Sequence, residues 1–203
     1  MFNLFKKTIH ESEYDQIEEL KSEAIGTLAL AGENCDSITG GIGEFGFSYN
    51  NPIPVNGDLG TYKYLTKLCS PSLHKLFFHR LGSLLNEINN HPIDAYEVVN
   101  FIGTIWDIIF IDFYHPRRSN LAPQGYSLKP YNKKIGDMPF AFGVNIYCND
   151  FPNDLPEKIK IHNGPPHSFA DMVSSSIQEN NFSPPESHKL KVMTIESKIV
   201  GRK

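Results

Sequence analysis

The sequence predicts an α+β fold: a mostly antiparallel central sheet of about four to five strands, with an N-terminal helix and further helices packed outside it. Segments rich in β-branched and aromatic residues gather in the middle of the chain, whereas segments with helical periodicity lie before and after them. The chain has 203 residues, 40% of them hydrophobic, which is enough to bury one large core. We therefore expect a single domain over residues 1–203.

The chain is expected to begin with an amphipathic helix that ends before Gly32. Its apolar residues with helical spacing are Ile17, Leu20, Ala24, Leu28 and Ala31. Residues 33–60 are rich in Gly, Asn and Pro, which indicates a long loop. Because this segment also contains Phe45 and Phe47, we expect the loop to be ordered and to cover the body of the domain. A short helix is predicted over 59–69.

Four strands are predicted in the middle of the chain. They cover residues 76–81, 95–101, 105–114 and 140–148, and Gly103 predicts a hairpin between the second and the third. The third strand contains Asp107 and Asp112, whose odd separation places them on opposite faces of the sheet. A short helix around 169–177 and a last strand over 189–200 complete the prediction.

The third strand leads into the sequence FYHPRRS, which carries the first candidate site. Pro116 lacks an amide hydrogen, so the strand should end near it and leave two arginines at its end. Guanidinium groups bind phosphate and carboxylate, while imidazole and carboxylate groups perform acid–base chemistry. The candidate anion ligands are Arg80, Arg117 and Arg118, and the candidate catalytic residues are His79, Asp112 and His115. The alternative is structural: the arginines pair with carboxylates of the chain itself.

Other chemical motifs have little support in this sequence. GGIGEFG matches the spacing of a nucleotide-binding loop, but no strand precedes it and no helix follows it as such a loop requires. The histidines and cysteines do not show zinc-ligand spacing, and there is no serine elbow. A thiol site at Cys69 or Cys148 is less typical than a role for these residues in the core. We therefore expect no cofactor and no dedicated metal site.

Charge and hydropathy limit the partners and the location of the protein. A net charge of −4 lacks the strong basic excess that would by itself suggest nucleic-acid binding. No apolar run is long enough to cross a membrane, and the N-terminal sequence does not resemble a secretory signal. The three cysteines are odd in number and far apart, which fits a reducing compartment. We expect a soluble, cytoplasmic protein.

Three segments, NPIPVNG at 51–57, FFHRLGS at 77–83 and FYHPRRS at 113–119 followed by APQGY, resemble a family of small uncharacterised bacterial proteins. The resemblance implies a bacterial origin and transfers no catalytic role. Since no catalytic signature is strong and aromatic residues are abundant, the leading hypothesis is a non-enzymatic domain that binds, and so neutralises or chaperones, another protein. The alternative is an enzyme or ligand-binding domain for a phosphorylated or anionic substrate.

Overall fold

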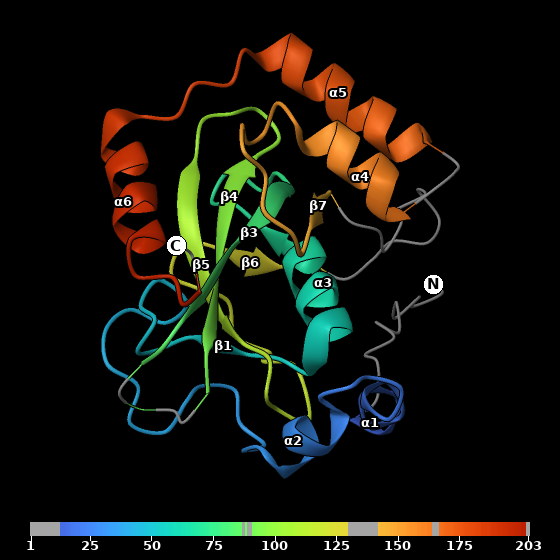
Figure 1. Cartoon of the computed structure of the whole chain (residues 1–203), viewed down its shortest axis with the longest axis vertical. Helices are drawn as coiled ribbons and strands as arrows, with labels where there is room; N and C mark the ends of the chain where they lie inside the picture. The colour runs from blue at the N-terminus through green and yellow to red at the C-terminus, as the bar shows by residue number, and fades with distance from the viewer. Residues whose placement is uncertain (1–12, 87, 89–90, 130–141, 164–166, 202–203) are drawn as a thin grey trace, which may run out of the picture.

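The computed structural model describes residues 13–86, 88, 91–129, 142–163 and 167–201. Its centre is a mixed sheet with the strand order β1-β5-β4-β3-β7 (Figure 1). The strands are β1 Ile53–Pro54, β3 Leu76–Leu84, β4 Ile93–Asn100, β5 Trp106–Asp112 and β7 Gly143–Val144. The three long strands run antiparallel, and the two short edge strands pair in parallel with β5 and β3. The predicted α+β class is confirmed, with a mixed sheet instead of a purely antiparallel one.

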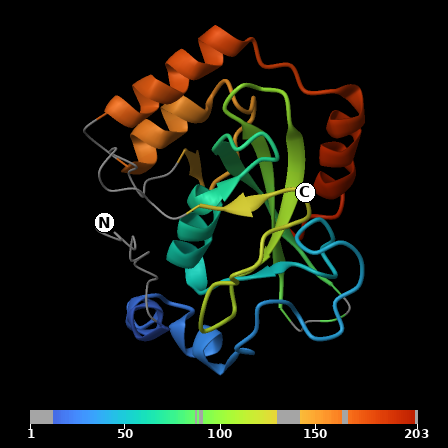
Figure 2. The same ribbon diagram turned by 180° about the vertical axis from the view of Figure 1, so that it is seen from behind.

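Helices lie on both faces of this sheet and at both of its ends (Figures 1 and 2). In chain order they are α1 Glu13–Leu20, α2 Gly26–Ala31, α3 Gly57–Lys67, α4 Leu155–Asn163, α5 Ser168–Asn180 and α6 Glu186–Glu196. The short strands β2 Leu68–Cys69 and β6 Ser127–Leu128 pair separately. In Figure 1, α1 and α2 lie at the lower end of the sheet and α4 and α5 at the upper end.

The alternation of side chains along the strands divides the core between the two faces of the sheet. On one face, Ile109 and Ile111 of β5 pack with Tyr64 and Leu65 of α3. On the other face, Ile108 and Phe110 pack with apolar residues of α6, namely Val192 and Ile195, and with Ile199 just beyond it. Near the upper end, Phe77, Val99 and Trp106 pack with α4 and α5.

Several predicted elements are confirmed. The central strands, the hairpin with Gly103 at a φ of 71° and the helices α3 and α5 lie where the sequence placed them. Phe45 and Phe47 of the segment predicted as a long loop pack against the core. The loop is shorter than predicted, because Ile53–Pro54 form β1 and α3 begins at Gly57. The fourth predicted strand, 140–148, is confirmed only at residues 143–144, which form β7. Residues 142 and 145–148 are not in a strand, and residues 140 and 141 lie outside the described part.

Two predicted elements differ from the structure. The N-terminal helix is broken into α1 and α2, because the chain folds back so tightly that a Cβ at Gly26 would lie 2.0 Å from the Leu20 carbonyl oxygen. The last strand, predicted over 189–200, is wrong, because helix α6 covers most of that range. Its side chains toward the sheet, at positions 188, 192, 195 and 199, follow the helical period and not the period of a strand. Helix α4 was not predicted.

Candidate functional site

Arg80, the first of the candidate anion ligands, forms a bidentate ion pair within the sheet. Arg80 Nε donates to Asp94 Oδ2 at 2.7 Å, and Arg80 Nη2 donates to Asp94 Oδ1 at 2.8 Å. Arg80 Nη2 also donates to Ser83 Oγ at 2.6 Å. This fork of donors is the part of a guanidinium group that grips a phosphate or a carboxylate. In Arg80 the chain's own carboxylate takes that place.

Arg117 and Arg118 lie just beyond β5, as predicted, and bind the N-terminal segments. Arg117 Nη1 donates to Asp36 Oδ1 at 2.6 Å, and this bond lowers the pKa of Asp36. Arg118 Nη1 donates to Asn56 Oδ1 at 2.8 Å and to Glu19 Oε2 at 3.4 Å. All three arginines therefore contact carboxylates of the chain itself. This is the result expected if the arginines stabilise the fold and do not bind an anionic ligand. An anionic substrate would have to displace these ion pairs.

Asp112 and His115 meet at the end of β5. His115 Nε2 lies 3.2 Å from Asp112 Oδ2, and His115 Nδ1 donates to the Glu33 carbonyl oxygen at 2.7 Å. Burial alone would lower the pKa of His115, but the Asp112 carboxylate and the Glu33 carbonyl outweigh burial and raise it. The negative charge of Asp112 next to Nε2, together with the hydrogen bond from Nδ1 to Glu33, favours the charged form of His115.

This ion pair should make stability depend on pH. The pKa of His115 is higher in the folded chain than its unfolded value near 6.5, so the contribution is complete below about pH 6.5 and is lost as the pH rises through the folded pKa. We expect the difference in free energy of unfolding between the wild type and H115Q to shrink from about pH 6 to about pH 9. Urea denaturation measures this difference, and one that grows with pH would contradict the assignment.

A cysteine next to His115 gives this cluster the outline of a thiol protease triad. Cys35 Sγ lies 3.8 Å from His115 Nδ1, on the opposite side of the ring from Asp112. A thiol nucleophile needs a free imidazole nitrogen to take its proton. Here Nδ1 already donates to Glu33, and burial raises the pKa of Cys35 to about 11. The thiol therefore stays protonated, and the cluster is not arranged for nucleophilic catalysis.

His79, the remaining candidate, belongs to a separate buried network. His79 Nε2 lies 2.8 Å from Glu97 Oε2, and His188 Nε2 lies 2.8 Å from Glu97 Oε1. The amide of Cys148 donates to His79 Nδ1 at 3.0 Å. Burial alone would raise the pKa of Glu97, but the hydrogen bonds from His188 and His79 outweigh it and lower the pKa below its usual value.

These contacts determine the protonation of His79. Because His79 Nδ1 accepts a hydrogen bond from a backbone amide, this nitrogen carries no proton, and the ring is neutral with its proton on Nε2. Glu97 is therefore an ionised carboxylate that receives one N–H group from each ring. His188 Nδ1 is buried and has no hydrogen-bond partner among the described residues. In this network, His188 Nδ1 is therefore a ring nitrogen whose hydrogen-bonding capacity is not used by the described residues.

A hollow of about 350 Å³ opens above the network, between α6 and residues 147–151, and we call it the histidine hollow. Its lining comprises His79, Leu81, Glu97, Tyr147, Cys148, Asn149, Asp150, Phe151, Pro184, His188, Lys189, Val192, Met193 and Glu196. His79 is the single sequence-predicted site residue in this lining. Of the six predicted residues, Asp112 contacts His115, and Arg117 Nη1 donates to the Arg118 carbonyl oxygen at 3.2 Å. Arg80 and His79 instead bind Asp94 and Glu97, so the six side chains do not form one site.

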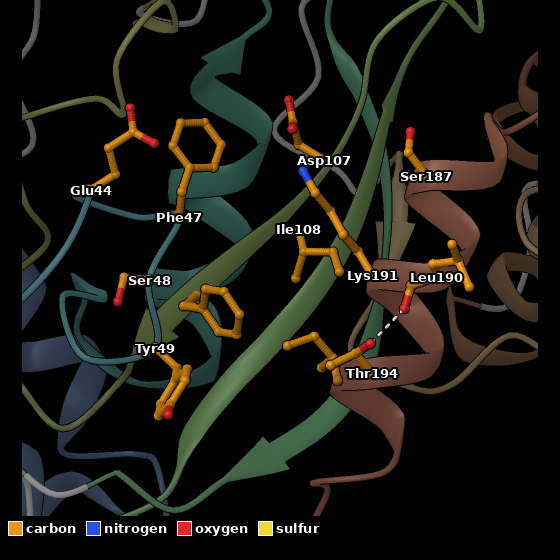
Figure 3. Close-up of a pocket in the computed structure, with 12 residues that line it drawn as sticks. Glu44, Phe47, Ser48, Tyr49, Asp107, Ile108, Ser187, Leu190, Lys191 and Thr194 are labelled. Carbon is orange, nitrogen blue, oxygen red and sulfur yellow. Dashed lines mark hydrogen bonds between the residues drawn. The ribbon is translucent and has the colours of Figure 1, made fainter.

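A larger groove of about 620 Å³ lies on the other side of α6, and we call it the β5 groove (Figure 3). Its lining comprises Glu44, Phe47, Ser48, Tyr49, Asp107, Ile108, Phe110, Ser187, Leu190, Lys191, Thr194 and Ile195. Figure 3 shows Phe47 and Tyr49 of the long loop on one side, Leu190 and Thr194 of α6 on the other and Ile108 between them. The groove is therefore apolar at its floor and carries charges at its rim.

Comparisons of the chain with protein-family models, curated proteins and solved structures find no match. Among the described residues, no group of three or more His, Cys, Asp or Glu side chains is arranged to hold a metal ion. Within the same part of the chain, no helix has both the length and the apolar character that a membrane span needs. The histidine hollow and the β5 groove lie on either side of α6.

The residues that sequence reasoning missed are Glu97, His188 and Cys35. Glu97 had a recognisable signal, because a carboxylate inside an apolar strand needs a buried partner. His188 had none, since it follows two prolines in a segment that was read as the approach to a strand. Their contact joins positions 91 residues apart and depends on the path of the whole chain.

Proposed function

We propose that this chain is a protein-binding domain that holds an extended segment of another protein in the β5 groove. The observation that carries the proposal is the strand edge in the groove. β1 pairs with β5 only at Ile111 and Asp112, and the amide of Phe110 donates to the Gly46 carbonyl oxygen at 2.9 Å. In the described part of the chain, no strand pairs with the rest of this edge, residues 106–109.

A strand edge of this kind binds an extended peptide through main-chain hydrogen bonds, while neighbouring side chains supply specificity. Alternate residues of a strand direct their amides to the same side, so Ile108 presents its N–H and C=O toward the groove, as Phe110 does toward Gly46. At about 3.3 Å per residue, an edge of about four residues is about 13 Å long. That length suits a short segment added beside β5.

The side chains around this edge indicate what the segment should contain. Apolar side chains would pack on Phe47 and Ile108, and on Leu190, which is 62% exposed in the unbound chain. Glu44 belongs to the long loop, Asp107 belongs to β5, and the Lys191 side chain extends from α6 toward Asp107 (Figure 3). An apolar segment with a basic residue facing the loop fits this distribution of charge.

Site-specific photocrosslinking in host cells tests the proposal. A photoreactive residue at Leu190 should label one partner, whereas the same residue at Leu28 should not, although the two positions are matched at 62% and 63% exposure. The purified partner should bind L190D about tenfold more weakly than the wild type, because a carboxylate would be buried against apolar atoms, and should bind L28D normally.

Hydrogen exchange tests the proposed main-chain hydrogen bonds between β5 and the bound segment. When the partner is bound, hydrogen exchange at the Ile108 amide should slow strongly, since this amide would become part of a strand pair. Equal labelling from positions 190 and 28, unchanged affinity of L190D or unchanged exchange at position 108 would each rule out strand addition in the groove.

A further inference from the structure

We propose that the β5 groove binds the C-terminal end of a partner protein, with the terminal carboxylate near Lys198. This inference rests on the proposed strand addition and specifies which kind of segment is added. It starts from a difference between the two ends of the groove. Figure 3 shows Glu44 and Asp107 toward one end and Tyr49 toward the other. We call the second one the Tyr49 end, and β5 approaches it as the strand runs from residue 106 to residue 112.

The Tyr49 end of the groove is closed to a continuing strand. The amide of Phe110 already donates to the Gly46 carbonyl oxygen at 2.9 Å, and Ile111 and Asp112 pair with β1. The Tyr49 ring packs on Phe110 with ring centroids 6.1 Å apart. A segment that pairs with residues 106–109 therefore cannot continue along β5 beyond Phe110. A chain that ends at this point fits the groove without having to turn out of it.

Lys198 provides positive charge at this closed end. Its Nζ lies 5.5 Å from the centroid of the Tyr49 ring, a cation–π contact that holds the ammonium group beside the groove. Lys198 is exposed, and no carboxylate among the described residues pairs with it. A terminal carboxylate would gain an attractive partner here, whereas a terminal ammonium group would meet a like charge. The terminus that suits the closed end is therefore a C-terminus.

This orientation determines the direction of the bound segment. A chain whose C-terminus lies at the Tyr49 end runs parallel to β5, as β1 does. Toward the other end of the groove, a basic side chain of the segment would face Glu44 and Asp107. Lys191 offsets part of that acidic charge, but its ammonium group lies near Asp107 and away from Tyr49 (Figure 3). The charges of the groove thus match a segment with a basic residue upstream and a carboxylate at its end.

Selection from two displayed peptide libraries tests this inference. In the first library, random sequences form the free C-terminus of a carrier protein, and in the second the same sequences are followed by a fixed Gly-Ser tail. We expect binders from the first library, with an apolar last residue and a Lys or Arg upstream, and few from the second. Equal enrichment from both would overturn the inference and leave strand addition standing. No enrichment from either would contradict the proposed function as well.

A variant of Lys198 locates the carboxylate. One selected peptide is synthesised with a C-terminal carboxylate and with a C-terminal amide, and fluorescence anisotropy measures both affinities. The amide should bind about fivefold more weakly, because it loses the attraction to Lys198. In K198A the two peptides should bind equally, at the affinity that the amide has for the wild type.

K189A is the matched control, because Lys189 belongs to the same helix region but lines the histidine hollow on the other side of α6. This variant should change neither affinity. A preference for the carboxylate that persists in K198A, or an equal loss in K189A, would overturn the assignment of the carboxylate to the Tyr49 end.

Discussion

E97A is expected to lower the free energy of unfolding by about 3 to 5 kcal/mol, among the largest effects of any single substitution in this chain. Removal of the carboxylate leaves the Nε2–H groups of His79 and His188 buried without an acceptor. Urea denaturation measures the loss. E179A, at an exposed position of α5, is the control and should change stability by less than about 0.5 kcal/mol.

The loss should be localised as well as large. His188 is the buried residue of α6, all of whose residues are described, and Glu97 is its hydrogen-bond partner on the sheet. In E97A, hydrogen exchange should therefore accelerate more in α6 than in α3, which packs on the opposite face. E97Q keeps one acceptor oxygen and should lose about 1 to 3 kcal/mol. If E97A and E179A unfold at the same urea concentration, the network does not stabilise the fold.

The central strands could be predicted from the sequence because their local composition and their tertiary environment agree. The β5 run of aromatic and β-branched residues is buried on both faces, so no other element suits it. The C-terminal segment KLKVMTIESKIV lacks this agreement. At several positions its apolar residues fit both the period of a helix and the alternation of a strand. Only the contacts of positions 188, 192, 195 and 199 with the sheet select the helix.

The candidate site was harder to predict than the fold, because chemistry depends on which distant residues meet. The sequence showed that His79 and Arg80 are neighbours, but the alternation along β3 sends them to different partners, Glu97 and Asp94. It also placed Arg117 and Arg118 correctly at the strand end. Their partners lie in α1 and in the long loop, at sequence separations that local patterns do not reach.

R118A should show that the second arginine of FYHPRRS holds the N-terminal segment on the sheet. Arg118 is 5% exposed, its guanidinium group donates to Asn56 Oδ1 and Glu19 Oε2, and its backbone amide donates to Gln16 Oε1 at 2.9 Å. Removing the guanidinium leaves Asn56 Oδ1 and Glu19 short of a donor, at an expected cost of about 2 to 4 kcal/mol. R117A should cost about 1 kcal/mol, because its partner Asp36 is 37% exposed.

Comparing R118A with R117A distinguishes a structural role of the arginine pair from a role in ligand binding. R118K keeps the charge but loses the planar fork, so its stability should lie between those of R118A and the wild type. Hydrogen exchange in α1 should accelerate in R118A and change little in R117A, because Gln16 and Glu19 belong to α1 and Asp36 does not. Losses of equal size in R117A and R118A, or a larger loss in R117A, would contradict this assignment. A thermal shift with inorganic phosphate that disappears in either variant would instead restore the anion-binding interpretation of the pair.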